Sequence, residues 1–186
     1  MVKKGIILLL CALISLFVSA KSPVGGGSPV GDASAAGDPS ASPPQGDSDS
    51  DDLEKAPDFT LPDKDGGEFT LSSTRGQYVV LDFWGTWCAV CIKSIPKMKE
   101  YYAKCLGKVM FIGVSCGDSP ERWKQVCDIL KLPWKNVQVG RDNSVSRLYH
   151  VSGFPTKVMI DPEGNVVKKF VGEDPRFYAV LDKLLK

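Results

Sequence analysis

The sequence has few of the residues that build metal and haem sites. It contains one histidine, His150, and one closely spaced pair of cysteines. A structural zinc site usually takes four Cys or His ligands, often from two such pairs, so the composition disfavours zinc. Covalent haem attachment needs a histidine directly after the second cysteine of the pair, and Ile92 stands there. We therefore expect no metal and no cofactor.

Apolar runs long enough to cross a membrane are also missing. The run from Ile6 to Val18 has 13 residues, whereas a spanning helix needs about 20. Two lysines precede it and the small-residue pattern Val18-Ser19-Ala20 ends it, so residues 1–20 are predicted to be an export signal. We expect a periplasmic or otherwise exported protein. A retained signal that tethers the chain to the membrane is the alternative.

Residues 21–52 have no aromatic side chain and little that could be buried. They consist mainly of Gly, Pro, Ser, Ala and Asp, and hold six of the 22 acidic residues. Such a segment cannot offset the entropy of ordering its backbone. It is predicted to be a disordered acidic linker before a single domain at residues 53–186.

Basic runs are absent from the predicted domain. Residues 53–186 contain 20 Lys and Arg and 16 Asp and Glu, a net charge of +4 with histidine neutral. This mild excess gives no support to nucleic-acid binding. The oligomeric state stays open.

The most informative segment is the cysteine pair in Cys88-Ala89-Val90-Cys91. The apolar run from Tyr78 to Phe83 predicts a buried strand before it, and a helix-like segment follows. The first thiol therefore meets a helix N-terminus, where unpaired N–H groups and the helix dipole favour the thiolate. We expect a redox-active pair, with a merely structural disulfide as the alternative.

Five cysteines remain after removal of the predicted signal, and an odd number leaves at least one thiol free. They are Cys88, Cys91, Cys105, Cys116 and Cys127. We expect Cys127 on a helix that covers the opposite sheet face from the Cys88 helix. A Cys105–Cys127 bridge would then have to cross the sheet, which disulfide geometry forbids. A Cys116–Cys127 bridge stays possible.

Strand and helix signals alternate along residues 53–186, with a β-hairpin at each end. The expected elements are a hairpin at Phe59–Leu61 and Glu68–Leu71, a strand at Tyr78–Phe83, a helix from Cys88 to about Leu106 that Pro96 kinks, a strand at Val109–Ser115, a helix from Pro120 to about Leu130 capped by Ser119, a strand at Val137–Val139, a helix at Asp142–Tyr149 capped by Asp142, a hairpin at Lys157–Ile160 and Val166–Val171, and a helix from Pro175 to Lys186. This order implies an α/β sandwich with a mixed sheet.

Several segments, in this order and spacing, resemble the TlpA/ResA-like branch of the thioredoxin superfamily from about residue 54 onward. They are Ala56–Leu61, Phe83–Cys91, Pro96, Val151–Thr156 and Ile160–Gly164. The resemblance implies a thioredoxin-like sandwich, with a mixed central sheet flanked by helices and an extra N-terminal β-hairpin. It also implies an enzyme, a thiol–disulfide oxidoreductase, in which Pro155 follows a cis peptide bond and faces the disulfide.

The resemblance assigns roles to individual residues. Cys88 would attack a substrate disulfide, and Cys91 would then resolve the mixed disulfide. Asp82 would accept the proton of Cys91, with a pKa raised by burial. A strand residue that faces solvent is the alternative for Asp82.

Four neighbouring residues are expected to contact an extended substrate segment. They are Trp87, Phe154, Pro155 and Thr156. Trp87 would add apolar surface beside Cys88, whereas Trp84 is expected to pack in the core.

Two positions depart from the family pattern. Many TlpA/ResA-like proteins have Glu three residues after the second cysteine, where this chain has Ser94, so the roles of that Glu do not carry over. Ala89-Val90 is neither the Gly-Pro typical of reductants nor the Pro-His of strong oxidants. It leaves the redox potential open.

The sequence thus predicts an exported reductant of protein disulfides that itself takes electrons from a membrane-bound reductase. An oxidase or isomerase is the nearest alternative. A thiol peroxidase is another, since the opening hairpin resembles that of peroxiredoxins, but Thr86 does not complete their Thr-x-x-Cys motif. A tethered, non-enzymatic binding module is the last.

Overall fold

The computed structural model describes residues 54–186, so the predicted export signal and linker lie outside the described residues. The strands are β1 (Thr60–Pro62), β2 (Glu68–Thr70), β3 (Tyr78–Trp84), β4 (Val109–Cys116), β5 (Lys135–Val139), β6 (Thr156–Ile160) and β7 (Val166–Val171). The helices are the 3₁₀ turn η1 (Leu71–Thr74), α1 (Ala89–Lys104), α2 (Pro120–Leu130), α3 (Ser144–Leu148) and α4 (Pro175–Leu184). Within residues 54–186, every helix is too short or too polar to cross a membrane.

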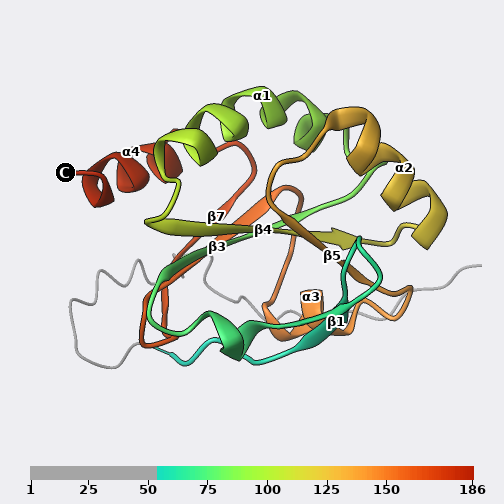
Figure 1. Cartoon of the computed structure of the whole chain (residues 1–186), viewed down its shortest axis with the longest axis horizontal. Coiled ribbons are helices and arrows are strands. Elements are labelled where there is room, and N and C mark those ends of the chain that lie inside the picture. Colours follow the sequence, from blue (N-terminus) through green and yellow to red (C-terminus); the bar gives the residue numbers. More distant parts are fainter. Residues whose placement is uncertain (1–53) are drawn as a thin grey trace, which may run out of the picture. The chain divides into compact units, whose positions relative to one another are not determined.

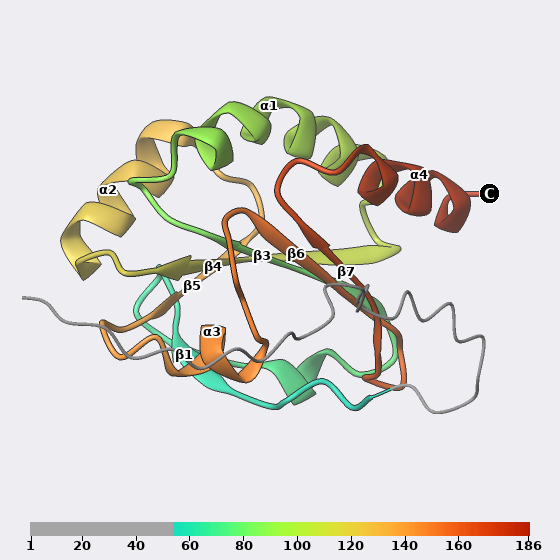
Figure 2. The ribbon, with the colours of Figure 1, turned by 180° about the vertical axis from the view of Figure 1, so that it is seen from behind.

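A five-stranded mixed sheet, in the order β5-β4-β3-β6-β7, forms the centre of the domain. Strands β3, β4 and β5 run parallel, and β6 and β7 continue the sheet antiparallel. Helices α1, α2 and α4 cover one face, and α3, η1 and the β1–β2 hairpin cover the other (Figures 1 and 2). The expected α/β sandwich with a mixed sheet and an additional hairpin is confirmed.

The expectation that α2 covers the opposite face from α1 is wrong. Helix α1 links β3 to β4, and α2 links β4 to β5, so both crossovers step across the sheet in the same direction. Because such crossovers are right-handed, both helices fall on the same face. The sheet therefore does not separate Cys105 from Cys127, yet both thiols are free.

The side chains of β3 divide between two cores. Val79, Leu81 and Phe83 pack toward the hairpin and α3. Val80 packs on the opposite face, toward α1 and α4. Asp82 has the same parity as Val80, so the alternation of a strand places it on the helix face.

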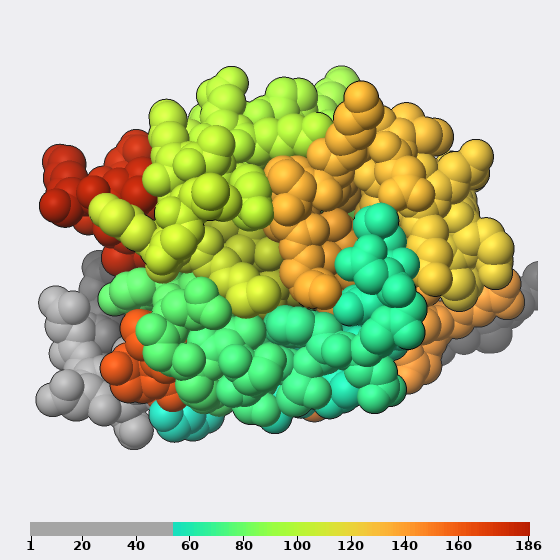
Figure 3. All heavy atoms as spheres, in the orientation of Figure 1, coloured from blue at the N-terminus to red at the C-terminus, as the bar shows by residue number. Residues whose placement is uncertain are grey.

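The β1–β2 hairpin packs against the edge of the sheet and α2. Lys64 N donates a hydrogen bond to Asn136 O at 3.0 Å, and Lys64 Nζ pairs with Asp128 Oδ1 at 3.0 Å. Asp63 accepts a hydrogen bond from Lys135 Nζ at 3.1 Å. Figure 3 shows this turn lying against the α2 and β5 region. The hairpin therefore belongs to the folded domain.

Two local expectations concern helices α1 and α3. Helix α1 continues through Pro96, where the proline removes one backbone hydrogen bond and Ile95 and Met98 are buried in the core; the kink at Pro96 stays a prediction. Asn143 occupies the N-cap position of helix α3 without a side-chain hydrogen bond, whereas Asp142 Oδ1 accepts a hydrogen bond from Ser144 N at 3.3 Å, as the predicted capping role of Asp142 requires. Asn143 adopts a left-handed backbone with φ of 51°, which Asn tolerates better than most residues.

Candidate active site

The cysteine pair forms a disulfide at the start of α1. Cys88 is the N-cap of the helix and Cys91 lies in its first turn, with their Cα atoms 5.3 Å apart. Cys88 Sγ also accepts a hydrogen bond from Cys91 N at 3.2 Å. Cys88 is 7% exposed and Cys91 2%. The helix N-terminus therefore stabilises negative charge on the sulfur that solvent and partners reach more easily.

The loop between β3 and the disulfide is fixed by a buried carboxylate, Asp118. Thr86 N donates to Asp118 Oδ2 at 2.9 Å, and Ser115 Oγ donates to the same oxygen at 2.7 Å. Arg122 Nε donates to Thr86 Oγ1 at 2.8 Å. Asp118 was not identified from the sequence, since no local motif links it to a loop 32 residues earlier.

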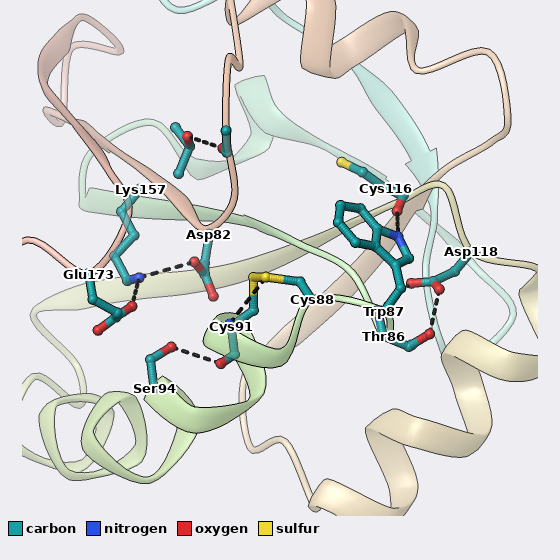
Figure 4. The surroundings of a disulfide bond; sticks show 12 residues. Asp82, Thr86, Trp87, Cys88, Cys91, Ser94, Cys116, Asp118, Lys157 and Glu173 are labelled. Atoms are coloured by element: carbon teal, nitrogen blue, oxygen red, sulfur yellow. Dashed lines mark hydrogen bonds and ion pairs between the residues drawn. A yellow bond between two sulfur atoms is a disulfide. The ribbon is translucent and has the colours of Figure 1, made fainter.

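Trp87 projects from this loop beside Cys88 (Figure 4). Its side chain is 55% exposed, yet the indole N–H donates to Cys116 O at 3.0 Å. The ring meets Phe154 edge to face at a centroid distance of 5.0 Å. Gly85 permits this arrangement, because a Cβ there would come within 2.5 Å of the Trp87 indole nitrogen. Trp84, by contrast, is buried, as expected.

Trp87 and Phe154 form one wall of a surface hollow of about 420 Å³. The polar residues Asn143, Ser146 and Arg147 also line it. The hollow therefore offers two aromatic side chains and one cationic side chain, and it reaches the active-site loop through Trp87.

The three residues Phe154, Pro155 and Thr156 differ in exposure: Phe154 is half-buried, whereas Pro155 and Thr156 are buried. The Phe154–Pro155 peptide bond is cis. Pro155 is buried and its carbonyl accepts a hydrogen bond from Gly172 N at 2.7 Å. The Thr156 side chain is buried and donates to Gly153 O. Within residues 54–186, Phe154 N–H and C=O have no hydrogen-bond partner, and Phe154 is half-buried, so its backbone groups are free to pair with another chain.

Asp82 is buried on β3, and its side chain points toward the disulfide at the start of α1 (Figure 4). Its Oδ1 lies 3.6 Å from Lys157 Nζ, beyond hydrogen-bond distance, and has no hydrogen-bond partner. Burial raises the pKa of Asp82 above its ordinary value, and the charge of Lys157 partly offsets that rise. The solvent-facing alternative for Asp82 does not hold.

Lys157 and Glu173 were not identified from the sequence. Lys157 is 1% exposed, and its Nζ lies 2.9 Å from Glu173 Oε1 in the segment before α4. The sequence does contain one indication of this ion pair, because Lys157 is a charged residue within the buried strand Thr-Lys-Val-Met-Ile and needs a partner of opposite charge.

The other thiols are less suited to chemistry. Cys105, Cys116 and Cys127 are free and buried, and burial raises the pKa of Cys116 and of Cys127 to about 12. The possible Cys116–Cys127 bridge is not formed. His150 is exposed and follows α3. Within residues 54–186, no group of three or more His, Cys, Asp and Glu side chains is arranged to hold a metal ion.

Comparisons with known proteins agree with this geometry. Residues 53–169 match the AhpC/TSA family. The chain is 32% identical over 124 residues to the thiol-disulfide oxidoreductase ResA of a Bacillus cereus strain, covering 66% of this chain and 71% of that protein. It is 38% identical over 120 residues to ResA of Bacillus subtilis (strain 168), covering 63% and 65%.

The chain is also similar to solved structures of thiol–disulfide oxidoreductases. A putative thiol:disulfide interchange protein DsbE from Chlorobium tepidum superposes with a TM-score of 0.65 at 31% identity, covering 73% of this chain and 95% of that one. The thioredoxin domain of a thiol-disulfide oxidoreductase from Bacteroides vulgatus also gives 0.65, at 30% identity, covering 72% and 96%. The thioredoxin-like fold and the TlpA/ResA-like resemblance are confirmed. The chain belongs to the AhpC/TSA family, as a thiol–disulfide oxidoreductase of the thioredoxin fold.

Proposed function

We propose that this oxidoreductase is exported and reduces disulfides in client proteins through Cys88 and Cys91. The observation that carries the proposal is the Cys88–Cys91 pair at the N-terminus of α1, beside the buried Asp82. The export signal predicted at residues 1–20 supports a location where client proteins form disulfides.

In the first step the Cys88 thiolate attacks one sulfur of a client disulfide. A Cys88–client disulfide forms, and the other client sulfur leaves as a thiolate and takes up a proton. Cys91 then loses its proton and attacks Cys88 Sγ, so that the Cys88–Cys91 bond forms and the Cys88–client bond breaks. Two electrons and two protons have then passed from the dithiol to the client.

Asp82 is the proposed acceptor of the Cys91 proton. A carboxylate works best as a base near neutral pH when its pKa lies above the ordinary range, and burial shifts the pKa of Asp82 in that direction. Ser94, which replaces the Glu of many relatives, donates to Cys91 O at 2.8 Å and provides no carboxylate.

The client is proposed to lie as an extended segment along Trp87 and the Phe154-Pro155-Thr156 turn. Free backbone groups on Phe154 suit pairing with an extended chain, and Trp87 adds exposed apolar surface. Pro155 and Thr156 would act by shaping this turn from beneath, since both are buried.

Each turnover leaves Cys88–Cys91 oxidised, so the enzyme needs an electron donor. We propose a membrane-bound reductase, because an exported protein is separated from the cytosolic reductants.

The test of the mechanism is a trapping experiment. Cys91→Ser should stall after attack by Cys88 and accumulate mixed disulfides with clients, whereas the matched Cys88→Ser variant should trap none. Equal trapping by both variants would contradict the assignment of Cys88 as nucleophile.

The equilibrium potential of Cys88–Cys91 against glutathione tests the direction. We expect a value well below that of a strong oxidant, since a potential near about −120 mV would make the protein an oxidase instead. Rapid peroxide consumption that depends on Cys88 would favour a thiol peroxidase. Full biological function of the Cys88→Ser and Cys91→Ser variants would favour a binding module.

A further inference from the structure

Asp82 belongs to a row of paired residues that crosses the whole sheet on the helix face. In order from β5 to β7, the row is Asn136, Gly113, Asp82, Lys157 and Phe170. Neighbours in such a row share one face of the sheet and lie within reach of each other. The partners of Asp82 are therefore set by the residues on either side of it.

The β4 side of the row leaves Asp82 without a partner. Gly113 has no side chain, and a Cβ added there would come 2.7 Å from Asn136 Oδ1 and 3.0 Å from Trp134 Nε1. Those atoms already occupy the space, so a larger residue does not fit. Among the two strands that flank β3, only β6 supplies a charge to Asp82, through Lys157.

Lys157 lies between two carboxylates and is held more closely by the outer one. Its Nζ is 2.9 Å from Glu173 Oε1 and 3.6 Å from Asp82 Oδ1. The Glu173 side chain is 31% exposed, whereas that of Asp82 is 10% exposed. Tyr178 OH donates to the other oxygen of Glu173 at 3.4 Å. The hydrogen bonds of Lys157 thus go to Glu173, while Asp82 receives only the electrostatic effect of the cation.

We propose that Lys157 and Glu173 are positioning residues that together set the pH at which Asp82 takes the proton from Cys91. This inference rests on the role proposed for Asp82 above. Glu173 competes with Asp82 for the Lys157 cation, so Lys157 and Glu173 have opposite effects on the pKa of Asp82. The charge of Lys157 lowers the pKa of Asp82, and the charge of Glu173 raises it.

Other ionisable groups surround this cluster and stay constant in the test. Besides Lys157 and Glu173, the groups on the elements packed around Asp82 are Cys91 and Lys97 on α1, Cys116 on β4 and Tyr178 on α4. Lys97 Nζ lies 3.9 Å from the Tyr178 ring centroid. Exchanging Lys157 or Glu173 therefore changes one charge in the cluster at a time.

The experiment follows the resolving step directly. Reduced protein is mixed with 5,5′-dithiobis(2-nitrobenzoate), and the second release of thionitrobenzoate, from the Cys88 mixed disulfide, is timed across pH. Lys157→Met should move the midpoint of this phase upward by about one pH unit, and Glu173→Gln should move it downward, because these are the effects of removing a nearby opposite or like charge. Glu173→Asp keeps the negative charge and should therefore have the wild-type midpoint.

Controls separate a structural effect from an electrostatic one. Lys168→Met removes an exposed lysine of β7 and should leave the midpoint in place. If Lys157 and Glu173 had only a structural role, both variants would exchange more slowly, but their pH midpoints would not move in opposite directions. If Lys157→Met does not fold, Glu173→Gln decides alone, and an unmoved or raised midpoint overturns the inference.

Asp82→Asn distinguishes this inference from the mechanism on which it rests. If Asp82→Asn leaves the wild-type pH profile intact, the proposed role of Asp82 fails. If Asp82→Asn abolishes the midpoint while Lys157→Met and Glu173→Gln leave it unchanged, the role of Asp82 stands and the positioning by Lys157 and Glu173 is overturned.

Discussion

At the scale of single residues, Asp82 works against the stability of the fold. Its carboxylate is buried, and its nearest cation makes no hydrogen bond to Oδ1. Burial raises its pKa in the folded protein, whereas an unfolded chain has the ordinary value of about 3.9. Below that value Asp82 is protonated in both states. As pH rises toward the folded-state pKa, ionisation favours the unfolded state, so stability is lost.

We predict that Asp82→Asn stabilises the oxidised protein at pH 8 by about 1–4 kcal/mol, the range for neutral replacement of buried ionic groups. The gain should shrink toward zero at pH 3, where the wild-type carboxyl is already neutral. Urea unfolding of both proteins at the two pH values measures it. Asp65→Asn, at an exposed position, is the control and should be close to neutral throughout. A gain of equal size at both pH values would contradict the prediction.

At the scale of elements, the active-site loop depends on a second loop that follows β4. Asp118 accepts hydrogen bonds from Thr86 N, Thr86 Oγ1 and Ser115 Oγ at 2.9, 2.5 and 2.7 Å. The backbone carbonyl of Asp118 accepts a hydrogen bond from Gln138 Nε2 at 2.8 Å, which links the two loops to β5. The loop that carries Trp87 is therefore held in place by the loop after β4 and, through it, by β5.

Asp118→Ala should lower the free energy of unfolding by about 1–3 kcal/mol for each buried donor that loses its partner. It should also slow reduction of a protein disulfide more than reduction of a small aromatic disulfide, because Trp87 is the residue proposed to contact clients. Denaturant unfolding and parallel rate measurements test both effects. Asp128→Ala, which breaks an exposed ion pair with Lys64, should cost about 1 kcal/mol or less. Similar losses in the two variants would refute the bracing role of Asp118.

Local patterns sufficed for most elements but not for the contacts between them. The apolar run of β3, the Ser119 cap of α2 and the turn between β6 and β7 are local signals, and each was identified correctly. The face covered by α2 depends on the direction of two crossovers, which composition does not reveal. The contact of Lys157 with Glu173 depends in the same way on how α4 follows β7. Such interactions come from tertiary packing.

At the scale of the whole molecule, the segment just before β1 is part of the fold. Val166 N donates to Glu54 O at 2.8 Å, and Ala56 N donates to Gly164 O at 3.0 Å. Tyr149 OH donates to Pro57 O at 2.7 Å. Ala56 and Phe59 are buried in the core shared with the hairpin and β3. Residues 54–59 are therefore part of the folded domain, and the boundary at the end of the predicted linker stays a prediction.

Two truncations test this boundary. A chain of residues 53–186 should keep the melting temperature and thiol-exchange rate of the longer protein, because it retains every contact described above. A chain of residues 60–186 should be far less stable, since loss of a buried Phe alone typically costs about 3–5 kcal/mol. Thermal unfolding monitored by circular dichroism, with the exchange rate measured on the same samples, compares them. If residues 53–186 unfold at a much lower temperature than the full chain, earlier residues contribute to the fold and the proposed domain boundary is wrong.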